Sequence, residues 1–276
     1  MRAILAAYSD PADNHLPAIT VAFKLINAEK VSANVATITR YAKRMNLTAG
    51  RKPPHKSRKR GSIVATKPNE AWHLDVTVVT TMNNHKAYVQ ILIDNYSRKI
   101  LAWKVTTSNT AINSTELLKS AFAKLADVPQ EDIKLIVDGG SENNNRHVEA
   151  WLETVPVQKL IAQVDVTFSN SMIEAVNKII KHRYLFRKPI LDPEHLQKVM
   201  AEAVTDYNAL PHYKHCGLSP NEAYDGKIFD KKAYQERLKK AHEYRLRENR
   251  TEWHPCIPWN ETEDKVCRQS PTGEPA

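Results

Sequence analysis

The chain has 276 residues, of which 42% are hydrophobic and 26% are charged, a composition typical of a globular protein with one sizeable core and smaller flanking pieces. Its longest apolar stretches, such as residues 88–93, are far too short to cross a bilayer, and residues 3–8 are too short for a signal-peptide core. The three irregularly spaced cysteines do not suggest a disulfide framework, so we expect a cytoplasmic protein.

The net charge of +9 is concentrated in the N-terminal part of the chain. Residues 1–60 carry twelve Lys and Arg against three acids, whereas the remaining 216 residues carry 28 of each sign. Lys and Arg that neutralise phosphates drive sequence-independent binding to nucleic acid, so this charge favours a polyanionic partner. The alternative is a basic tail that only keeps the protein in solution.

Residues 1–50 are predicted to hold a partial helix-turn-helix. Apolar side chains recur at helical spacing in residues 17–27 and again in residues 34–45, although a complete three-helix module would need residues that are absent here. The second helix would present side chains suited to base edges and phosphates, namely Asn34, Thr37, Arg40, Tyr41, Lys43 and Arg44. The alternative is a small packing subdomain with a solvated basic face.

Residues 51–70 are predicted to form a basic linker, because they contain three prolines and show no apolar periodicity. We expect this linker to lie along a DNA backbone through its cationic run, Lys56, Arg58, Lys59 and Arg60.

A sheet is predicted to begin at residue 71. Period-two alternation places Asp75 on the polar face of a first strand. Three such segments at short spacing predict an antiparallel meander over residues 71–78, 87–94 and 99–106. An amphipathic helix is expected over residues 113–126.

Asp138 follows a short apolar run, residues 133–137, that is suited to a buried strand. A helix is expected over residues 146–153 and a last strand over residues 160–168. These elements together predict an α/β fold in which helices cover both faces of a sheet.

Residues 171–183 are predicted to form a capped helix that carries Glu174. On a helical wheel, the polar side chains Glu174, Asn177, Lys178 and Lys181 fall within an arc of about 100°. Met172, Val176, Ile179 and Ile180 fall on the opposite side and are the expected core stripe. Further helices are expected over residues 192–211, 219–226 and 230–250, the last one long, charged and solvated, and the tail from residue 251 has no periodicity.

Asp75, Asp138 and Glu174 are the candidate site. Carboxylates from three separate elements can meet at one edge of a sheet and hold two Mg²⁺ or Mn²⁺ ions, which prefer oxygen ligands. Two such ions bind the attacking and leaving oxygens of a displacement at phosphorus. Because the chain has 31 acidic residues, the alternative is that this spacing arises by chance.

Four motifs resemble the catalytic core of insertion-sequence transposases and retroviral integrases. They are Trp72-x-x-Asp75-x-Thr77, Asp94-Asn-Tyr-Ser-Arg98 with Trp103, Asp138-Gly-Gly-Ser-Glu-Asn143, and Ser171-x-Ile-Glu174-x-x-Asn-Lys178-x-x-Lys181. Tyr207-Asn208, Pro211-His212 and Leu218-Ser-Pro-x-Glu222 resemble the closing segment of that core in the bacterial members. The match covers roughly residues 65–226; we place the core at residues 71–226, followed by a charged helix and irregular tail at residues 227–276.

The resemblance implies a ribonuclease H-like mixed sheet flanked by helices, with Asp75, Asp138 and Glu174 as the catalytic, metal-binding triad of two Mg²⁺ or Mn²⁺ ions. It implies cleavage of double-stranded DNA followed by strand transfer. From their position beside Glu174, we expect Lys178 and Lys181 to lie where the phosphate backbone of the DNA passes, and Asn177 to donate or accept a hydrogen bond there. The partners that the resemblance implies are element ends and target DNA at the bacterial chromosome, and further copies of the chain. The incomplete helix-turn-helix predicts an upstream DNA-binding protein as a further partner.

Two rival functions remain open at this point. One is a DNA-binding remnant that has lost catalysis, and the other is a nuclease of the same fold that cuts DNA without joining it.

Overall fold

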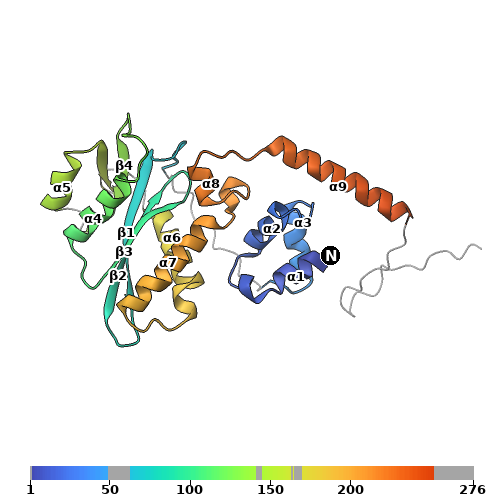
Figure 1. Ribbon diagram of the computed structural model, residues 1–276, viewed down its shortest axis with the longest axis horizontal. Helices are drawn as coiled ribbons and strands as arrows, with labels where there is room; N and C mark the ends of the chain where they lie inside the picture. The colour runs from blue at the N-terminus through green and yellow to red at the C-terminus, as the bar shows by residue number, and fades with distance from the viewer. Residues whose placement is uncertain (1, 49–62, 141–144, 163, 165–169, 252–276) are drawn as a thin grey trace, which may run out of the picture. The chain divides into compact units, whose positions relative to one another are not determined.

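A computed structural model of the chain describes residues 2–48, 63–140, 145–162, 164 and 170–251. The chain divides into two compact units, one formed by Met1–Pro53 together with Asp230–Ala276 and the other by Pro54–Phe229 (Figure 1). None of the helices within the described ranges is both long and apolar enough to span a membrane.

The larger unit is built on one five-stranded sheet with the strand order β3-β2-β1-β4-β5. The predicted antiparallel meander is confirmed, and its strands are β1 (Ala71–Thr80), β2 (Lys86–Asp94) and β3 (Ile100–Thr106). On the other side of β1, two parallel strands complete a mixed sheet, β4 (Ile133–Val137) and β5 (Val157–Ile161).

The position of β5 differs from the predicted strand at residues 160–168. β5 pairs residue for residue with β4, from Ile133↔Val157 to Val137↔Ile161. The bounds of β5 are therefore set by pairing with β4, and not by the apolar residues of β5 itself. Residues 163 and 165–169 of the predicted segment lie outside the described residues.

Helices cover both faces of the sheet, as expected (Figure 1). One face packs against α4 (Ala111–Phe122) and α5 (Arg146–Leu152), and the other packs against α6 (Ser171–Arg183) and α7 (Pro193–Ala209). Short elements follow these helices: two 3₁₀ turns at Leu185–Arg187 and Tyr213–His215, and α8 (Pro220–Tyr224), which begins with the predicted capping box of Ser219 and Glu222.

β1 alternates between these two apolar layers. Trp72 and Leu74 pack in the cluster on the α4 side, whereas Val79 packs in the cluster on the α6 and α7 side. The face predicted to be polar is therefore not a solvent face, and both His73 and Thr77 on it are buried. β1 is covered on both sides over its first residues, whereas Val78 and Thr80 near its end are exposed.

Asn208, near the end of α7, fastens that helix to the edge of the sheet. Its side-chain oxygen accepts a hydrogen bond from the backbone N–H of Ile100 at 2.9 Å, and its amide nitrogen donates to the Ile100 carbonyl at 2.9 Å. The neighbouring Tyr207 hydroxyl donates to the carbonyl of Arg98 at 3.1 Å. The Tyr207-Asn208 motif thus supplies polar partners to the first residue of β3 and to the turn before it.

Replacing Asn208 with alanine removes both bonds to Ile100 from a buried position, and we expect a loss of about 2–4 kcal/mol in the free energy of unfolding. Urea denaturation of the Asn208→Ala protein measures this loss. The matched control is Gln197→Ala, at an exposed position of the same helix, which we expect to change the free energy by less than about 0.5 kcal/mol. Equal urea midpoints for the two variants would contradict this role of Asn208.

The smaller unit combines the start of the chain with a helix from its far end. It contains α1 (Arg2–Tyr8), a 3₁₀ turn (Pro11–Asp13), α2 (Ala18–Asn27), α3 (Val35–Arg44) and α9 (Lys231–Thr251). The two helices predicted within residues 17–45 are present as α2 and α3.

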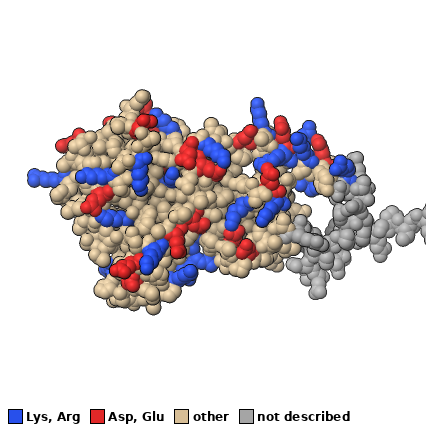
Figure 2. Space-filling view, in the orientation of Figure 1, with Lys and Arg blue, Asp and Glu red and all other residues tan. Residues whose placement is uncertain are grey.

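α9 packs against the N-terminal helices through one side of the helix. The Tyr234 ring joins the apolar cluster of Ile26 and its neighbours, and Arg237 pairs with Glu29 at 3.2 Å. Along its other positions, charged side chains of both signs alternate, as Figure 2 shows at upper right. The helix predicted to be solvated is therefore mostly exposed but has one packed stripe.

Replacing Tyr234 with alanine removes the aromatic ring that joins α9 to the cluster of α2 and α3, and we expect the smaller unit to lose about 1–3 kcal/mol of stability. Hydrogen exchange of the α2 and α3 amides measures the loss. The Tyr244→Ala protein, which alters a ring 54% exposed on the same helix, should exchange as the wild type does. Exchange in α2 and α3 that is the same in both variants would contradict the packing role.

Candidate active site

Asp75 and Asp138 lie beside one another where the parallel pairing of β1 and β4 ends. The last pair of this ladder is Leu74↔Val137, and the two aspartates are the next residues on the two strands. Adjacent residues of parallel strands in register point to the same face of a sheet, so this pairing brings two carboxylates from distant parts of the chain together. Asp138 is exposed and Asp75 is partly buried.

The carboxylate of Asp75 is held by two hydrogen bonds. Its Oδ1 accepts from the backbone N–H of Val76 at 2.8 Å, and its Oδ2 accepts from the side-chain amide of Asn177 at 2.7 Å. Burial raises the pKa of Asp75 to about 6, helped by the negative charges of Asp138 and Glu174 and opposed by the two hydrogen bonds. The pKa of Asp75 thus reflects all three predicted carboxylates.

Glu174 is exposed one turn into α6, the helix predicted at residues 171–183. The expected position of Asn177 on the polar face of this helix is wrong, because Asn177 is buried together with Ile173, Val176 and Ile180. Its amide points to Asp75 instead of to solvent. Asn177 therefore links the helix that carries Glu174 to the strand that carries Asp75.

Asn170 makes a second link between α6 and β1. It stands at the N-cap position, yet its side chain makes no capping bond to the helix. Its amide nitrogen donates to the carbonyl of Leu74 at 3.1 Å, and its oxygen lies 2.7 Å from Nδ1 of the His73 ring. Burial lowers the pKa of His73 to about 4, so the ring is neutral near pH 7.

The predicted DNA-binding residues fall into three groups. Lys178 is exposed on α6 one turn beyond Glu174, and Lys181 is partly buried on the same helix. In the smaller unit, Arg40, Lys43 and Arg44 are exposed on α3. The linker residues Lys56, Arg58, Lys59 and Arg60 lie outside the described residues.

Asn34, which the sequence suggested for base contacts, is the N-cap of α3. Its side-chain oxygen accepts a hydrogen bond from the backbone N–H of Ala36 at 2.9 Å. This role stabilises the start of the helix by satisfying one of its unpaired N–H groups.

The three carboxylates fit hard divalent cations in their donor chemistry, since Mg²⁺ and Mn²⁺ prefer carboxylate oxygens. Burial raises the pKa of Asp75 most, and the charges of Asp138 and Glu174 raise it further; a bound cation would relieve that repulsion. Across the part of the chain that the structure describes, however, no group of three or more His, Cys, Asp or Glu residues is arranged to hold a metal ion. The carboxylates share one electrostatic environment without forming a finished metal site in this conformation.

Sequence reasoning missed the buried polar residues around the site, His73, Asn95 and Asn170. Each is less than 5% exposed and each makes hydrogen bonds to the others or to backbone groups. One signal in the sequence could have found them: these polar residues lie within or next to strongly apolar segments. A polar side chain in such a segment is often buried, and a buried polar group needs a hydrogen-bond partner.

The fold and the acidic cluster together define a ribonuclease H-like domain with a candidate phosphoryl-transfer site. Comparison with known proteins agrees: residues 65–169 match the family model described as the integrase core domain. This similarity to the integrase core covers less than half of the chain. The matched range contains Asp75 and Asp138, whereas Glu174 follows its end.

Two bacterial relatives show the same likeness. A putative transposase for insertion sequence element IS986/IS6110 from Mycobacterium tuberculosis is 26% identical over 157 residues, covering 55% of this chain and 56% of that protein. The putative transposase InsK for insertion sequence element IS150 from Escherichia coli is 24% identical over 159 residues, covering 57% and 55%. The chain thus spans about half the length of the curated relatives it matches.

Among solved structures, a chain of the simian T-cell lymphotropic virus intasome superposes with a TM-score of 0.51 and 17% identity, over 74% of each chain. At this identity the likeness supports the shared fold alone.

We expect Mn²⁺ to raise the melting temperature of the wild-type protein by about 3–8 °C, because a ligand that binds the folded state stabilises it and here also relieves carboxylate repulsion. Asp138→Asn should abolish this shift while melting no lower than the wild type without metal, since it removes one of the repelling charges. Thermal melts with Mn²⁺ and with a chelator measure both effects.

The matched control for the metal experiment is Asp132→Asn, at an exposed aspartate just before β4. It should keep the full Mn²⁺ shift. An equal shift in wild type and Asp138→Asn would contradict metal binding at this site.

Proposed function

We propose that the chain is a transposase that cuts double-stranded DNA at the ends of a mobile element and joins those ends to target DNA. The observation that carries this proposal is geometric: the β1–β4 pairing sets Asp75 beside Asp138, and Asn177 of α6, the helix that carries Glu174, donates a hydrogen bond to Asp75. The match of residues 65–169 to the integrase core domain and the similarity to bacterial transposases support the proposal.

In this proposal Asp75, Asp138 and Glu174 hold the metal. Two Mg²⁺ or Mn²⁺ ions, when bound, would supply Lewis-acid stabilisation of the attacking and leaving oxygens at phosphorus. Asn177 and the N–H of Val76 keep the Asp75 carboxylate in one orientation, so that it need not reorganise during the reaction. Exposed Lys178 would contact a phosphate of the DNA beside Glu174.

The proposed partners are element-end and target DNA, bound in part by the basic face of α3 and the basic linker at residues 51–70. Two ends must be brought together for joining, so we propose that several copies of the chain act on one DNA complex. A protein encoded upstream is a further proposed partner, which would add DNA-binding residues to the short N-terminal helices. The setting of this activity would be the chromosome in the bacterial cytoplasm.

The test uses duplex oligonucleotides taken from the DNA that flanks the coding sequence, with Mn²⁺ and with the wild-type, Asp138→Asn and Asp132→Asn proteins. We expect wild type and Asp132→Asn to nick the end duplex and join it to target DNA. Asp138→Asn should bind the duplex yet lower both reactions by at least about 1,000-fold, because the site loses a charged ligand. Gel analysis of labelled strands separates nicked from joined products.

The outcomes distinguish the rival functions. Wild type that binds the duplex but neither nicks nor joins would indicate a DNA-binding remnant. Nicking without joined products, even when target DNA is in excess, would indicate a nuclease of the same fold.

A further inference from the structure

A chain of buried hydrogen bonds runs from Ile63 and Ala65, in the described part of the predicted linker, to the start of α6. Asn95, in the turn after β2, begins it: its Oδ1 accepts from the backbone N–H of Ala65 at 2.9 Å, and its Nδ2 donates to the carbonyl of Ile63 at 3.1 Å. The same Nδ2 lies 2.9 Å from Nε2 of the His73 ring. Because Asn95 is fully buried, its side chain bonds to these protein groups in place of water.

The contacts of Asn95 fix where the proton of His73 resides. Because Oδ1 of Asn95 is the atom that accepts from Ala65, the atom facing His73 is an NH₂ group, which can only donate. Nε2 of His73 must therefore accept, and the ring proton is on Nδ1. A doubly protonated ring would set two donors against each other.

Nδ1 of His73 then donates to Oδ1 of Asn170 at 2.7 Å, and Nδ2 of Asn170 donates to the carbonyl of Leu74 at 3.1 Å. Each donor in this series meets an acceptor. Asn170 is 1% exposed, and its side chain bonds to β1 in place of capping α6. A side chain at an N-cap position ordinarily accepts a hydrogen bond from its own helix and stabilises it. Asn170 makes its side-chain hydrogen bonds to β1 instead.

We infer that Asn95, His73 and Asn170 form a positioning relay that holds the first turn of α6, and with it Glu174, against β1. The inference rests on the proposed function in one respect, that Glu174 acts in the site. The relay acts on Glu174 through the helix backbone: the relay holds the Asn170 side chain, and the backbone N–H of Glu174 donates to the carbonyl of the same residue at 3.3 Å, as in any helical turn. Asn177 fixes the helix one turn further on, through Asp75.

Two substitutions of His73 test the relay as a matched pair. In His73→Asn the side-chain amide occupies the place of Nδ1 and can still donate to Asn170, whereas in His73→Gln it reaches the place of Nε2 and keeps only the contact to Asn95. Both remove the ring, so loss of ring packing is common to the two. Asn170→Ala removes the relay at its other end.

The first readout is hydrogen exchange of the α6 amides, measured without DNA or metal. We expect His73→Gln and Asn170→Ala to speed exchange in the first turn of α6 by about tenfold and His73→Asn to stay near the wild type. The second readout is the Mn²⁺ concentration needed for half-maximal DNA joining, which should rise in His73→Gln and Asn170→Ala and return toward the wild-type value in His73→Asn.

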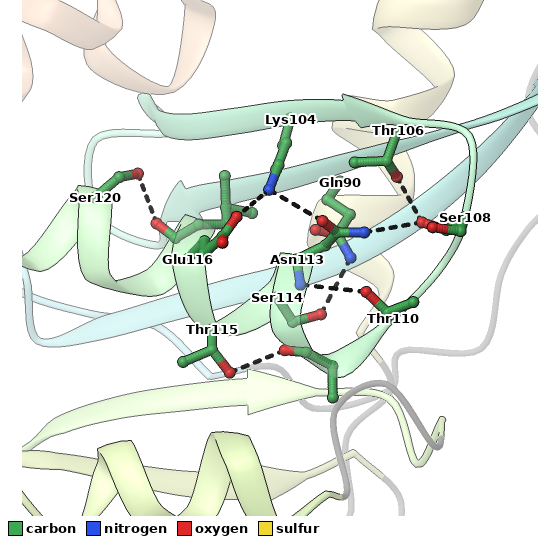
Figure 3. Close-up of polar contacts among 12 residues, drawn as sticks. Gln90, Lys104, Thr106, Ser108, Thr110, Asn113, Ser114, Thr115, Glu116 and Ser120 are labelled. Carbon is green, nitrogen blue, oxygen red and sulfur yellow. Dashed lines mark hydrogen bonds and ion pairs between the residues drawn. The ribbon is translucent and has the colours of Figure 1, made fainter.

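Gln90→Ala serves as a control for general destabilisation, because it leaves a cavity at a fully buried position. Gln90 is fully buried on the opposite face of the sheet, where its amide donates to Ser114 at 3.1 Å (Figure 3). This variant should lower the melting temperature without changing exchange in α6 relative to the rest of the unit. The relay would be overturned if His73→Asn and His73→Gln exchanged α6 amides at the same rate. It would also be overturned if α6 exchanged no faster in His73→Gln and Asn170→Ala than in Gln90→Ala.

The relay and the proposed function can fail separately. Wild-type protein that joins no DNA would refute the function, while the exchange measurements, which need no activity, would still decide whether the relay holds α6.

Discussion

The arrangement of the site depends on the parallel pairing of β1 with β4. Because this ladder ends at Leu74↔Val137, the chain leaves it with one aspartate on each strand, side by side. A slip of the register by one residue would turn a side chain to the opposite face of the sheet. The apolar layers on both faces make such a slip costly, since residues such as Trp72 and Leu74 would leave the cluster in which they are buried.

The site also carries an electrostatic cost that the surrounding fold has to offset. Asp75 is partly buried beside two other carboxylates, and its burial and their charges both disfavour its charged form and raise its pKa. Perturbed carboxylates of this kind concentrate at functional sites. The amide of Asn177 and the N–H of Val76 oppose the cost and keep the side chain oriented, so the same bonds serve both charge and geometry.

Periodicity in the sequence was enough to predict the meander, the helix of Glu174 and the layered sheet, because these depend on local alternation of apolar side chains. It placed Asn177 on the polar face of α6, although this residue is buried. A helical wheel gives only the direction of a side chain, whereas burial depends on which other elements pack against it. The predicted position of β5 was too far along the chain, because the bounds of this strand are set by pairing with β4. The bonds among His73, Asn95 and Asn170 join residues far apart in the chain, and no local pattern encodes such contacts.

The smaller unit has a consequence for synthesis of the protein. Its packed stripe on α9, including Tyr234, leaves the ribosome only after the whole of Pro54–Phe229 has been made. Domains generally fold as units while the chain is produced. The N-terminal helices must therefore wait, with part of their apolar cluster uncovered, until the domain between them and α9 has been completed, so the larger unit is expected to fold first although it begins second.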